Sequence, residues 1–344
     1  MVITCAGSNM RSRYIDNLKG VSIIFVVLFH TIKASLGQDY VTNILANVLQ
    51  PPLVPMFFVV AGYLMHGSQN LVPGKWLGNR ALYLLIPHVV MNALWYVGAL
   101  AGTAIDSALI RAVPFGLWML KSTFGACGEV FFLCLFCTLT ILLNLVLIER
   151  RNSTLTFWMY LLGSSVVVMG LPPVAMFVPQ FQWYYLFAIL GFLIARYQLV
   201  VRLRPFRWLV ILGVVLYLPA LWLSGWHGGW VSRGIMGVLM WLYNHDYTTA
   251  PLVMLQVLLG LCVISVIAGR LRTNSIALIG RYSFAVYFFH IPICALGFGS
   301  GWIRIASDFV MVCSCCFAVV LGLSYVSQLR RWIPLRSSAV RYYS

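Results

Sequence analysis

The chain has 344 residues, of which 62% are hydrophobic and only 9% charged, with a formal net charge of +16; its mean hydropathy is +0.92. Soluble domains carry roughly 25% charged residues, so the composition excludes an ordinary soluble protein, and the apolar content excludes a disordered chain. The basic residues lie between long apolar runs, a distribution that does not favour a nucleic-acid partner. We therefore predict an all-α, polytopic integral membrane bundle surrounded by the lipid bilayer.

A helix of about 20 apolar residues crosses roughly 30 Å of hydrocarbon, and ten stretches have this character. We expect them at residues 18–37, 45–66, 82–102, 126–148, 154–172, 182–198, 207–225, 249–269, 276–298 and 303–327. The stretches 103–125 and 226–248 are mixed, and are expected to be loops or short interfacial or re-entrant pieces. Pro51, Pro52 and Pro55 are expected to break or kink the second span.

The distribution of basic residues predicts the orientation of the bundle. Ten spans put both termini on one side, and a cytoplasmic N-terminus places 18 of the 23 Lys and Arg residues in cytoplasmic segments. This separation is the one that the positive-inside rule describes. We expect a multi-pass protein with a cytoplasmic tail at 1–17, a transmembrane domain at 18–327 and a basic cytoplasmic tail at 328–344.

Several familiar catalytic and metal-binding motifs are missing from the sequence. It has no phosphate-binding glycine motif ending in Gly-Lys-Ser/Thr, no His-Glu-x-x-His zinc helix and no Gly-x-Ser-x-Gly elbow. Eight of the nine cysteines lie inside or at the edge of apolar runs, where they are expected to pack between helices rather than form disulfides. No spacing of cysteine and histidine supports a metal site, and we expect none.

Two ionisable residues share one face of the first span. His30 lies 12 residues beyond the start of the span, and Lys19 lies 11 residues before His30, a rise of roughly 16 Å. An ionisable side chain inside a membrane is costly and therefore indicates a function, although a lone histidine also suits a structural contact between helices. In apolar surroundings His30 is expected to be neutral and able to accept a proton. Asp16 is expected to cap the helix and pair locally.

A second group of polar residues lies in the ninth span. Ser283, Tyr287 and His290 are spaced by four and three residues, so they stack along one face of a helix. These side chains fit a cavity shared with His30. They fit equally well a hydrogen-bond network that only holds helices together.

Glu129 lies at the outer end of the fourth span. It is the only carboxylate that we expect within reach of the outer half of the core. There it is suited to orient a histidine or to bind the hydroxyl of an acceptor. Pairing with Lys121 or Arg111 is the alternative.

These residues belong to five motifs that follow one another between residues 13 and 290. The first is a basic residue, ten others and a histidine, at Lys19 and His30. The others are PLVPMFFVVAGYLM from Pro52, NRALYLLIP from Asn79, EVFFLCLF from Glu129 and IGRYSFAVYFFH from Ile279. In this order the five motifs resemble those of the membrane-bound acyltransferase 3 family. The family's third motif has two arginines, of which Arg80 matches the first and Tyr83 replaces the second.

The resemblance implies an O-acyltransferase in the bacterial inner membrane. Such an enzyme takes an acyl group, commonly acetyl, from cytoplasmic acyl-CoA as co-substrate and has no permanently bound cofactor. Its acceptor is a hydroxyl of a cell-surface or exported glycan or of a lipid-linked sugar precursor, and glycan-synthesis proteins are the further partners expected.

The same resemblance, together with the predicted topology, implies roles for the residues above. Lys19 and Arg80 bind the phosphates of the donor, and His30 is the general base on the acceptor hydroxyl. The remaining catalytic candidates orient the substrate or stabilise the developing oxyanion; they are Ser283, Tyr287 and His290. Direct transfer and a covalent acyl-histidine both fit the sequence.

Two other functions remain open at this point. A transporter or flippase of an envelope glycan precursor suits ten helices, intramembrane histidines and a broken second helix. It also predicts charged groups along a path open to both sides, whereas the whole chain has only seven Asp and Glu residues. A non-catalytic assembly subunit is the third possible function, and it predicts that His30→Ala has no effect on function.

Overall fold

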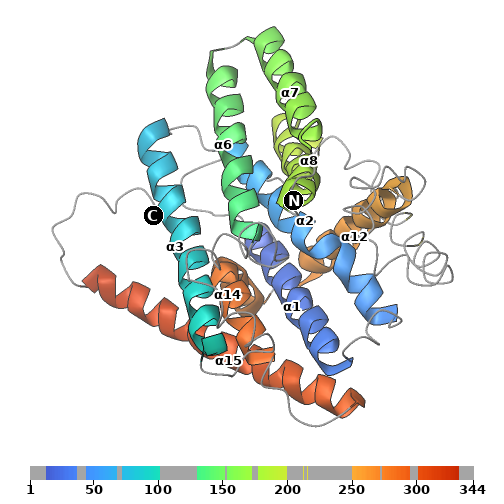
Figure 1. Ribbon diagram of the computed structural model, residues 1–344, viewed down its shortest axis with the longest axis vertical. Helices are drawn as coiled ribbons and strands as arrows, with labels where there is room; N and C mark the ends of the chain where they lie inside the picture. The colour runs from blue at the N-terminus through green and yellow to red at the C-terminus, as the bar shows by residue number, and fades with distance from the viewer. Residues whose placement is uncertain are drawn as a thin grey trace. The chain divides into compact units, whose positions relative to one another are not determined.

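The computed structural model describes residues 13–36, 44–67, 72–100, 130–151, 153–172, 177–199, 212, 215, 250–271, 273–294 and 301–332. The helices in this part of the chain are α1 (Arg13–Leu36), α2 (Ile44–His66), α3 (Pro73–Leu100), α6 (Val130–Arg150), α7 (Thr154–Met169), α8 (Phe177–Arg196), α12 (Ala250–Arg270), α13 (Asn274–Arg281), α14 (Ser283–Cys294) and α15 (Gly301–Trp332) (Figure 1). The described residues include no strand. The prediction of an all-helical fold is confirmed.

Several helices have the length and apolarity of membrane spans. Among the described residues, the long apolar helices are Arg13–Leu36, Phe131–Arg150 and Arg304–Gly322, and shorter ones are Pro52–His66, Thr154–Met169 and Val257–Arg270. On α7, Leu155 and Val166 are 73% and 72% exposed. Lipid solvates such a surface and water does not, so the structure is that of a membrane protein. The number of spans and the side on which the termini lie stay predictions.

Most of the predicted spans overlap an observed helix in the part of the chain that the structure describes. The span predicted at 207–225 lies almost entirely outside the described residues, as do the mixed stretches 103–125 and 226–248. Each of the other predicted spans overlaps an observed helix. α1 begins at Arg13, before the predicted start of the first span, so Asp16 lies in its first turn and is not the cap that we expected.

The second span is not broken at its prolines, whereas the kink expected there stays a prediction. α2 runs without interruption from Ile44 to His66, through all three prolines. Proline's fixed φ suits a helix, although its ring removes a backbone hydrogen bond. The ring of Pro52 is covered by α12, since a Cβ built on Gly260 would lie 2.7 Å from its Cγ.

The ninth predicted span is two helices rather than one. The chain leaves helical geometry at Tyr282, with φ −104° and ψ 21°, between α13 and α14. α13 exposes Asn274 and Arg281 but buries Gly280, as expected for a helix with one polar face. α14 carries a largely apolar sequence. The continuous helix expected from the sequence therefore divides where a one-sided polar pattern gives way to an apolar one.

The chain divides into two compact units. The first comprises Met1–Phe57, Leu203–Gly237 and Pro251–Ser344, and the second Phe58–Arg202 and Val238–Ala250. In the first unit α1 packs against α13, α14 and α15 (Figure 1). Because α1 has neighbours on several sides, its apolar residues are buried around most of its circumference.

Helix α13 lies directly on the backbone of α1. A Cβ built on Gly280 would overlap the carbonyl group of Asp16, and one built on Gly20 would overlap the carbonyl oxygen of Ile276. The side chain of Asn17 donates a hydrogen bond of 2.6 Å to the carbonyl oxygen of Leu271. Glycine at these two positions allows the close approach of the helices.

The second unit is organised around α6, which packs against α3, α7 and α8 (Figure 1). Here too a helix pair meets at glycines. A Cβ on Gly62 of α2 would overlap the carbonyl oxygen of Ala188, and a Cβ on Gly191 of α8 would overlap that of Val59. Small residues again permit backbone contact between two apolar helices.

Candidate active site

The structure brings His30 and His290 together, although 260 positions separate them in the sequence. α1 and α14 are in contact, and the centres of the two imidazole rings lie 5.0 Å apart with an angle of 62° between their planes. His30 is half-buried, whereas His290 is fully buried. The pair therefore has one partly accessible ring and one that is enclosed by protein.

His290 is held in one orientation by its own helix. Its Nδ1 lies 2.7 Å from the carbonyl oxygen of Tyr287 and 3.2 Å from that of Val286. A carbonyl oxygen only accepts, so Nδ1 carries the proton, and in a neutral imidazole Nε2 then presents a lone pair. Nε2 is buried and has no hydrogen-bond partner among the described residues.

The other two residues predicted on this face also lie in α14. Tyr287 is buried and its ring centre is 5.6 Å from that of His290. Ser283, the first residue of α14, is buried as well. It precedes His290 by seven residues, roughly 10 Å along the helix. Two of the three predicted residues thus lie in contact, and Ser283 lies two turns away on the same helix.

A cluster of charged residues, comprising Asp16, Lys19 and Arg281, lies at the N-terminal end of α1. Lys19 Nζ is 3.4 Å from one carboxylate oxygen of Asp16, and Arg281 Nε is 3.7 Å from the other. Asp16 and Lys19 are buried, whereas the Arg281 side chain is 54% exposed. The local pairing expected for Asp16 is confirmed, and sequence reasoning did not single out Arg281.

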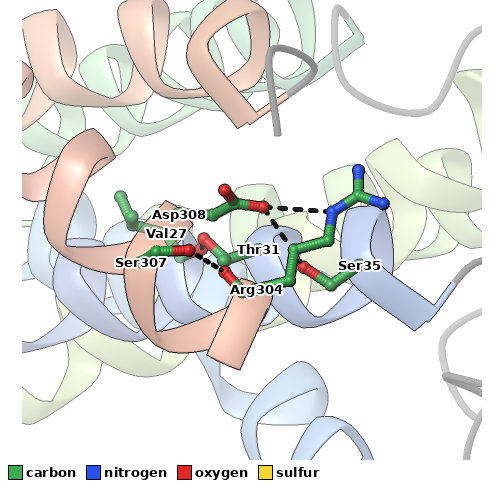
Figure 2. A network of polar contacts seen from close by, with 6 residues as sticks. All are labelled: Val27, Thr31, Ser35, Arg304, Ser307 and Asp308. Atoms are coloured by element: carbon green, nitrogen blue, oxygen red, sulfur yellow. Dashed lines mark hydrogen bonds and ion pairs between the residues drawn. The ribbon is translucent and has the colours of Figure 1, made fainter. Parts of the chain in front are cut away.

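The C-terminal end of α1 meets a second polar network, which Figure 2 shows with Arg304 and Asp308 of α15 beside Ser35 and Thr31 of α1. Asp308 is completely buried. One of its carboxylate oxygens lies 3.4 Å from Arg304 Nε and accepts a hydrogen bond of 3.4 Å from Ser35. These contacts join the end of α1 to the beginning of α15.

Asp308 is a buried carboxylate at the C-terminal end of α1 that the sequence analysis did not single out. Ser35 and Asp308 meet at the end of α1 that the predicted topology puts outside. Sequence reasoning missed this carboxylate, although its spacing of four residues from Arg304 was a usable signal for a helical ion pair. Glu129 itself lies outside the described residues.

Three groups of polar contacts therefore lie along α1. From Lys19 to His30 the helix rises roughly 16 Å, and from His30 to Ser35 roughly 8 Å more. They are the charged cluster around Lys19, the pair of His30 with His290, and the contact of Ser35 with the buried carboxylate of Asp308. The two histidines thus lie between charged residues at both ends of α1.

In the second unit, Arg80 lies on α3 with its guanidinium carbon 5.5 Å from the centre of the Trp76 ring. Its Nε is buried and has no hydrogen-bond partner among the described residues. Tyr83, which stands where the family motif has a second arginine, is 54% exposed. The Arg80 guanidinium thus retains a donor that a ligand anion would satisfy.

A further ionic cluster in the second unit joins the ends of three helices. Arg196 Nη1 and His66 Nε2 lie 2.9 Å and 3.4 Å from the same carboxylate oxygen of Glu149. The Arg196 guanidinium also covers the ring of Phe157 at 3.6 Å. These contacts bind α2, α6 and α8 together and are explained by structure alone.

The described residues contain no group of three or more His, Cys, Asp or Glu side chains that would hold a metal ion. Cys134 and Cys137 on α6 are free thiols in this part of the chain. Their spacing therefore reflects packing on a helix face, as the apolar sequence indicates.

Comparison with known proteins identifies the family. The family model for the acyltransferase domain of acyltransferase 3 proteins matches residues 12–328. The nodulation protein NolL of Sinorhizobium fredii (strain NBRC 101917 / NGR234) is 28% identical over 196 residues, which are 56% of this chain and 50% of that protein. The chain thus aligns with half the length of this relative, and no solved structure matches it. Since the family match covers nearly all of its helices, the chain belongs to the acyltransferase 3 family of membrane acyltransferases.

Proposed function

We propose that this protein is an O-acyltransferase, and specifically an O-acetyltransferase, of the bacterial inner membrane. It moves an acyl group from cytoplasmic acyl-CoA to a hydroxyl of a cell-surface or exported glycan or of its lipid-linked precursor. The family supports acyl transfer. The observation that carries the proposal is the half-buried His30, paired with His290 inside a bundle of apolar helices.

The donor is proposed to bind at the N-terminal end of α1, which the positive-inside rule assigns to the cytoplasm. Coenzyme A carries several phosphates, and cations bind phosphate oxygens through charge-assisted hydrogen bonds. Lys19 is buried against Asp16, so the more exposed Arg281 supplies the accessible charge of this cluster. For Arg80 of the second unit, the phosphate-binding role implied by the family motif stays a separate proposal, supported by its buried Nε, which has no hydrogen-bond partner among the described residues.

The reach of the donor supports this placement. The acyl-pantetheine arm of coenzyme A is roughly 15–20 Å long, and α1 rises roughly 16 Å from Lys19 to His30. A donor whose phosphates bind at the charged cluster around Lys19 therefore brings its thioester to the level of His30 and His290.

His30 is proposed to act as the general base. It takes the proton of the acceptor hydroxyl as that oxygen attacks the thioester carbon. The new C–O bond of the ester forms, the C–S bond breaks, and the proton passes from His30 to the departing thiolate, which leaves as free coenzyme A. The hydroxyl groups of Tyr287 and Ser283 are proposed to orient the substrate or to stabilise the oxyanion.

The acceptor is proposed to approach from the opposite end of α1. A carboxylate and a guanidinium are suited to bind sugar hydroxyl groups by charge-assisted hydrogen bonds. Asp308 and Arg304 combine these groups with the Ser35 hydroxyl, roughly 8 Å beyond His30. In this proposal the network takes the acceptor-binding role expected of Glu129.

The proposal is tested with purified protein in nanodiscs. Wild type, His30→Ala and the control His66→Gln are incubated with radiolabelled acetyl-CoA and envelope glycan extracts, and free thiol and labelled glycan are followed together. We expect transfer by wild type and by the control, because His66 pairs with Glu149 and is not part of the proposed site. His30→Ala is expected to lose 10²-fold or more of the rate, on the order of a general base's contribution.

Equal transfer by His30→Ala would refute the role of His30. Absence of transfer by wild type with all acyl-CoA donors tested, combined with movement of a glycan precursor across vesicles of the same protein, would replace the enzyme with the transporter.

A further inference from the structure

The tautomer of His290 leaves a buried acceptor next to His30. Nδ1 of His290 is occupied by the carbonyl oxygens of Tyr287 and Val286. Nε2 therefore carries a lone pair, and it has no hydrogen-bond partner among the described residues although His290 is fully buried. A buried acceptor without a donor destabilises the folded protein, because it has lost its hydrogen bonds to water. A group that supplies a proton to Nε2 removes that cost.

The separation of the two rings is right for such a donor. An N–H···N hydrogen bond is about 2.9 Å long, and each nitrogen lies about 1.1 Å from the centre of its own ring, so two bonded imidazoles have centres about 5.1 Å apart. The observed separation is 5.0 Å. The ring separation therefore matches that of two hydrogen-bonded imidazoles.

The two histidines also differ in how far they are buried. His30 is half-buried, whereas His290 is fully buried and held by α14. His30 is therefore the more exposed of the two residues. A neutral imidazole in this tautomer accepts at Nε2, which suits an N–H group better than an oxyanion.

We propose that His290 is a positioning residue for His30. Its Nε2 accepts a hydrogen bond from one ring N–H of His30, so that the other nitrogen of His30 faces the acceptor hydroxyl. When His30 has taken the hydroxyl proton, the same hydrogen bond stabilises the positive charge on its ring. The proton stays on His30 until it passes to the thiolate, and His290 keeps its own proton on Nδ1 throughout. This inference rests on the proposed acyl transfer.

Two substitutions of His290 separate the roles of its nitrogens. In His290→Gln the side-chain amide reaches the position of Nε2 and keeps an acceptor towards His30. In His290→Asn the shorter amide reaches only the position of Nδ1, so it keeps the bond to the Tyr287 carbonyl but removes the acceptor. We expect kcat to fall roughly 100-fold in His290→Asn and less than about 10-fold in His290→Gln. KM for acyl-CoA and acceptor is expected to stay within about threefold in both variants.

The opposite ranking, or a loss confined to KM, would overturn the proposal. A double mutant adds a check, because His290→Asn should lower the residual rate no further when His30 is already alanine. An additional loss in that background would mean that His290 acts independently of His30.

A measurement on the unmodified sequence covers the case in which the variants do not fold. Wild-type protein labelled with ¹⁵N only in histidine is studied by solid-state NMR in lipid. We expect one coupling between ring nitrogens of two histidines, across the N–H···N bond, and its absence would overturn the inference. Failure of acyl transfer with this coupling present would count against the proposed function and leave the histidine contact standing.

Discussion

Gly280→Ala tests the contact between α1 and α13 that holds the charged cluster in place. A Cβ at this position would overlap the Asp16 carbonyl group and would lie 2.7 Å from the backbone nitrogen of Gly20. Both neighbours are backbone atoms of a helix, so they give way only if α1 and α13 move apart. Overpacking of this kind costs about 1–3 kcal/mol, and the rigid neighbours favour the upper end of that range.

The substitution also has a stabilising contribution, because alanine favours a helix over glycine by about 1 kcal/mol. The net loss for Gly280→Ala is therefore about 2 kcal/mol. For 344 residues the unfolding entropy is about 0.7 kcal/mol/K, so a loss of about 2 kcal/mol is expected to lower Tm by about 3 °C. Gly163 on α7 is the matched control, since a Cβ there meets nothing within 4 Å, and Gly163→Ala is expected to leave Tm unchanged or raise it.

The assay is thermal unfolding of each variant in the same nanodiscs, followed by tryptophan fluorescence. Acyl transfer measured at a temperature where both variants are folded adds a functional reading, because separation of the helices displaces Arg281 from Asp16. Equal Tm values for Gly280→Ala and Gly163→Ala would refute the reasoning, since they would mean that α13 does not lie on the backbone of α1.

Three further predictions concern polar contacts, each measured by the same unfolding assay. Asp308→Ala removes the acceptor shared by Arg304 and Ser35 and is expected to cost about 2–3 kcal/mol, with a smaller loss for Asp308→Asn; equal losses would show that the charge is unimportant. Asn17→Ala removes the hydrogen bond of 2.6 Å to the carbonyl oxygen of Leu271, the residue after α12. The expected cost is about 1–2 kcal/mol, and an unchanged Tm would contradict that contact. Arg196→Lys keeps the charge but loses the planar contact over an aromatic ring at 3.6 Å, so a loss of about 1 kcal/mol is expected and full retention of stability would argue against stacking.

The helices and the family could be predicted because both depend on short stretches of sequence. A run of apolar residues forms a helix in lipid whatever its neighbours are, since every backbone group must be paired within the segment. The motifs around Lys19, Arg80 and His290 are likewise local. One local expectation did not hold. Proline was expected to interrupt the second span, but α2 continues through Pro52, whose ring is covered by α12.

The site could be predicted only as two separate histidines on two separate helices. The sequence indicates that His30 and His290 lie in apolar spans, but their contact depends on how α1 packs against α14. The tautomer of His290 depends in turn on the local path of α14, which begins anew after Tyr282. Asp308 was overlooked for a similar reason, since a charge near a helix end is ordinary until packing buries it.

Hydropathy and motif spacing are properties of contiguous residues, so they were enough to identify a helical membrane protein of an acyltransferase family. Which polar side chains meet depends instead on how the helices pack. Contacts between residues hundreds of positions apart depend on the close approach of helices at glycines such as Gly20 and Gly280. Packing of α13, α14 and α15 against α1 brings His290 to His30 and charged residues to both ends of α1, and no local pattern in the chain specifies it.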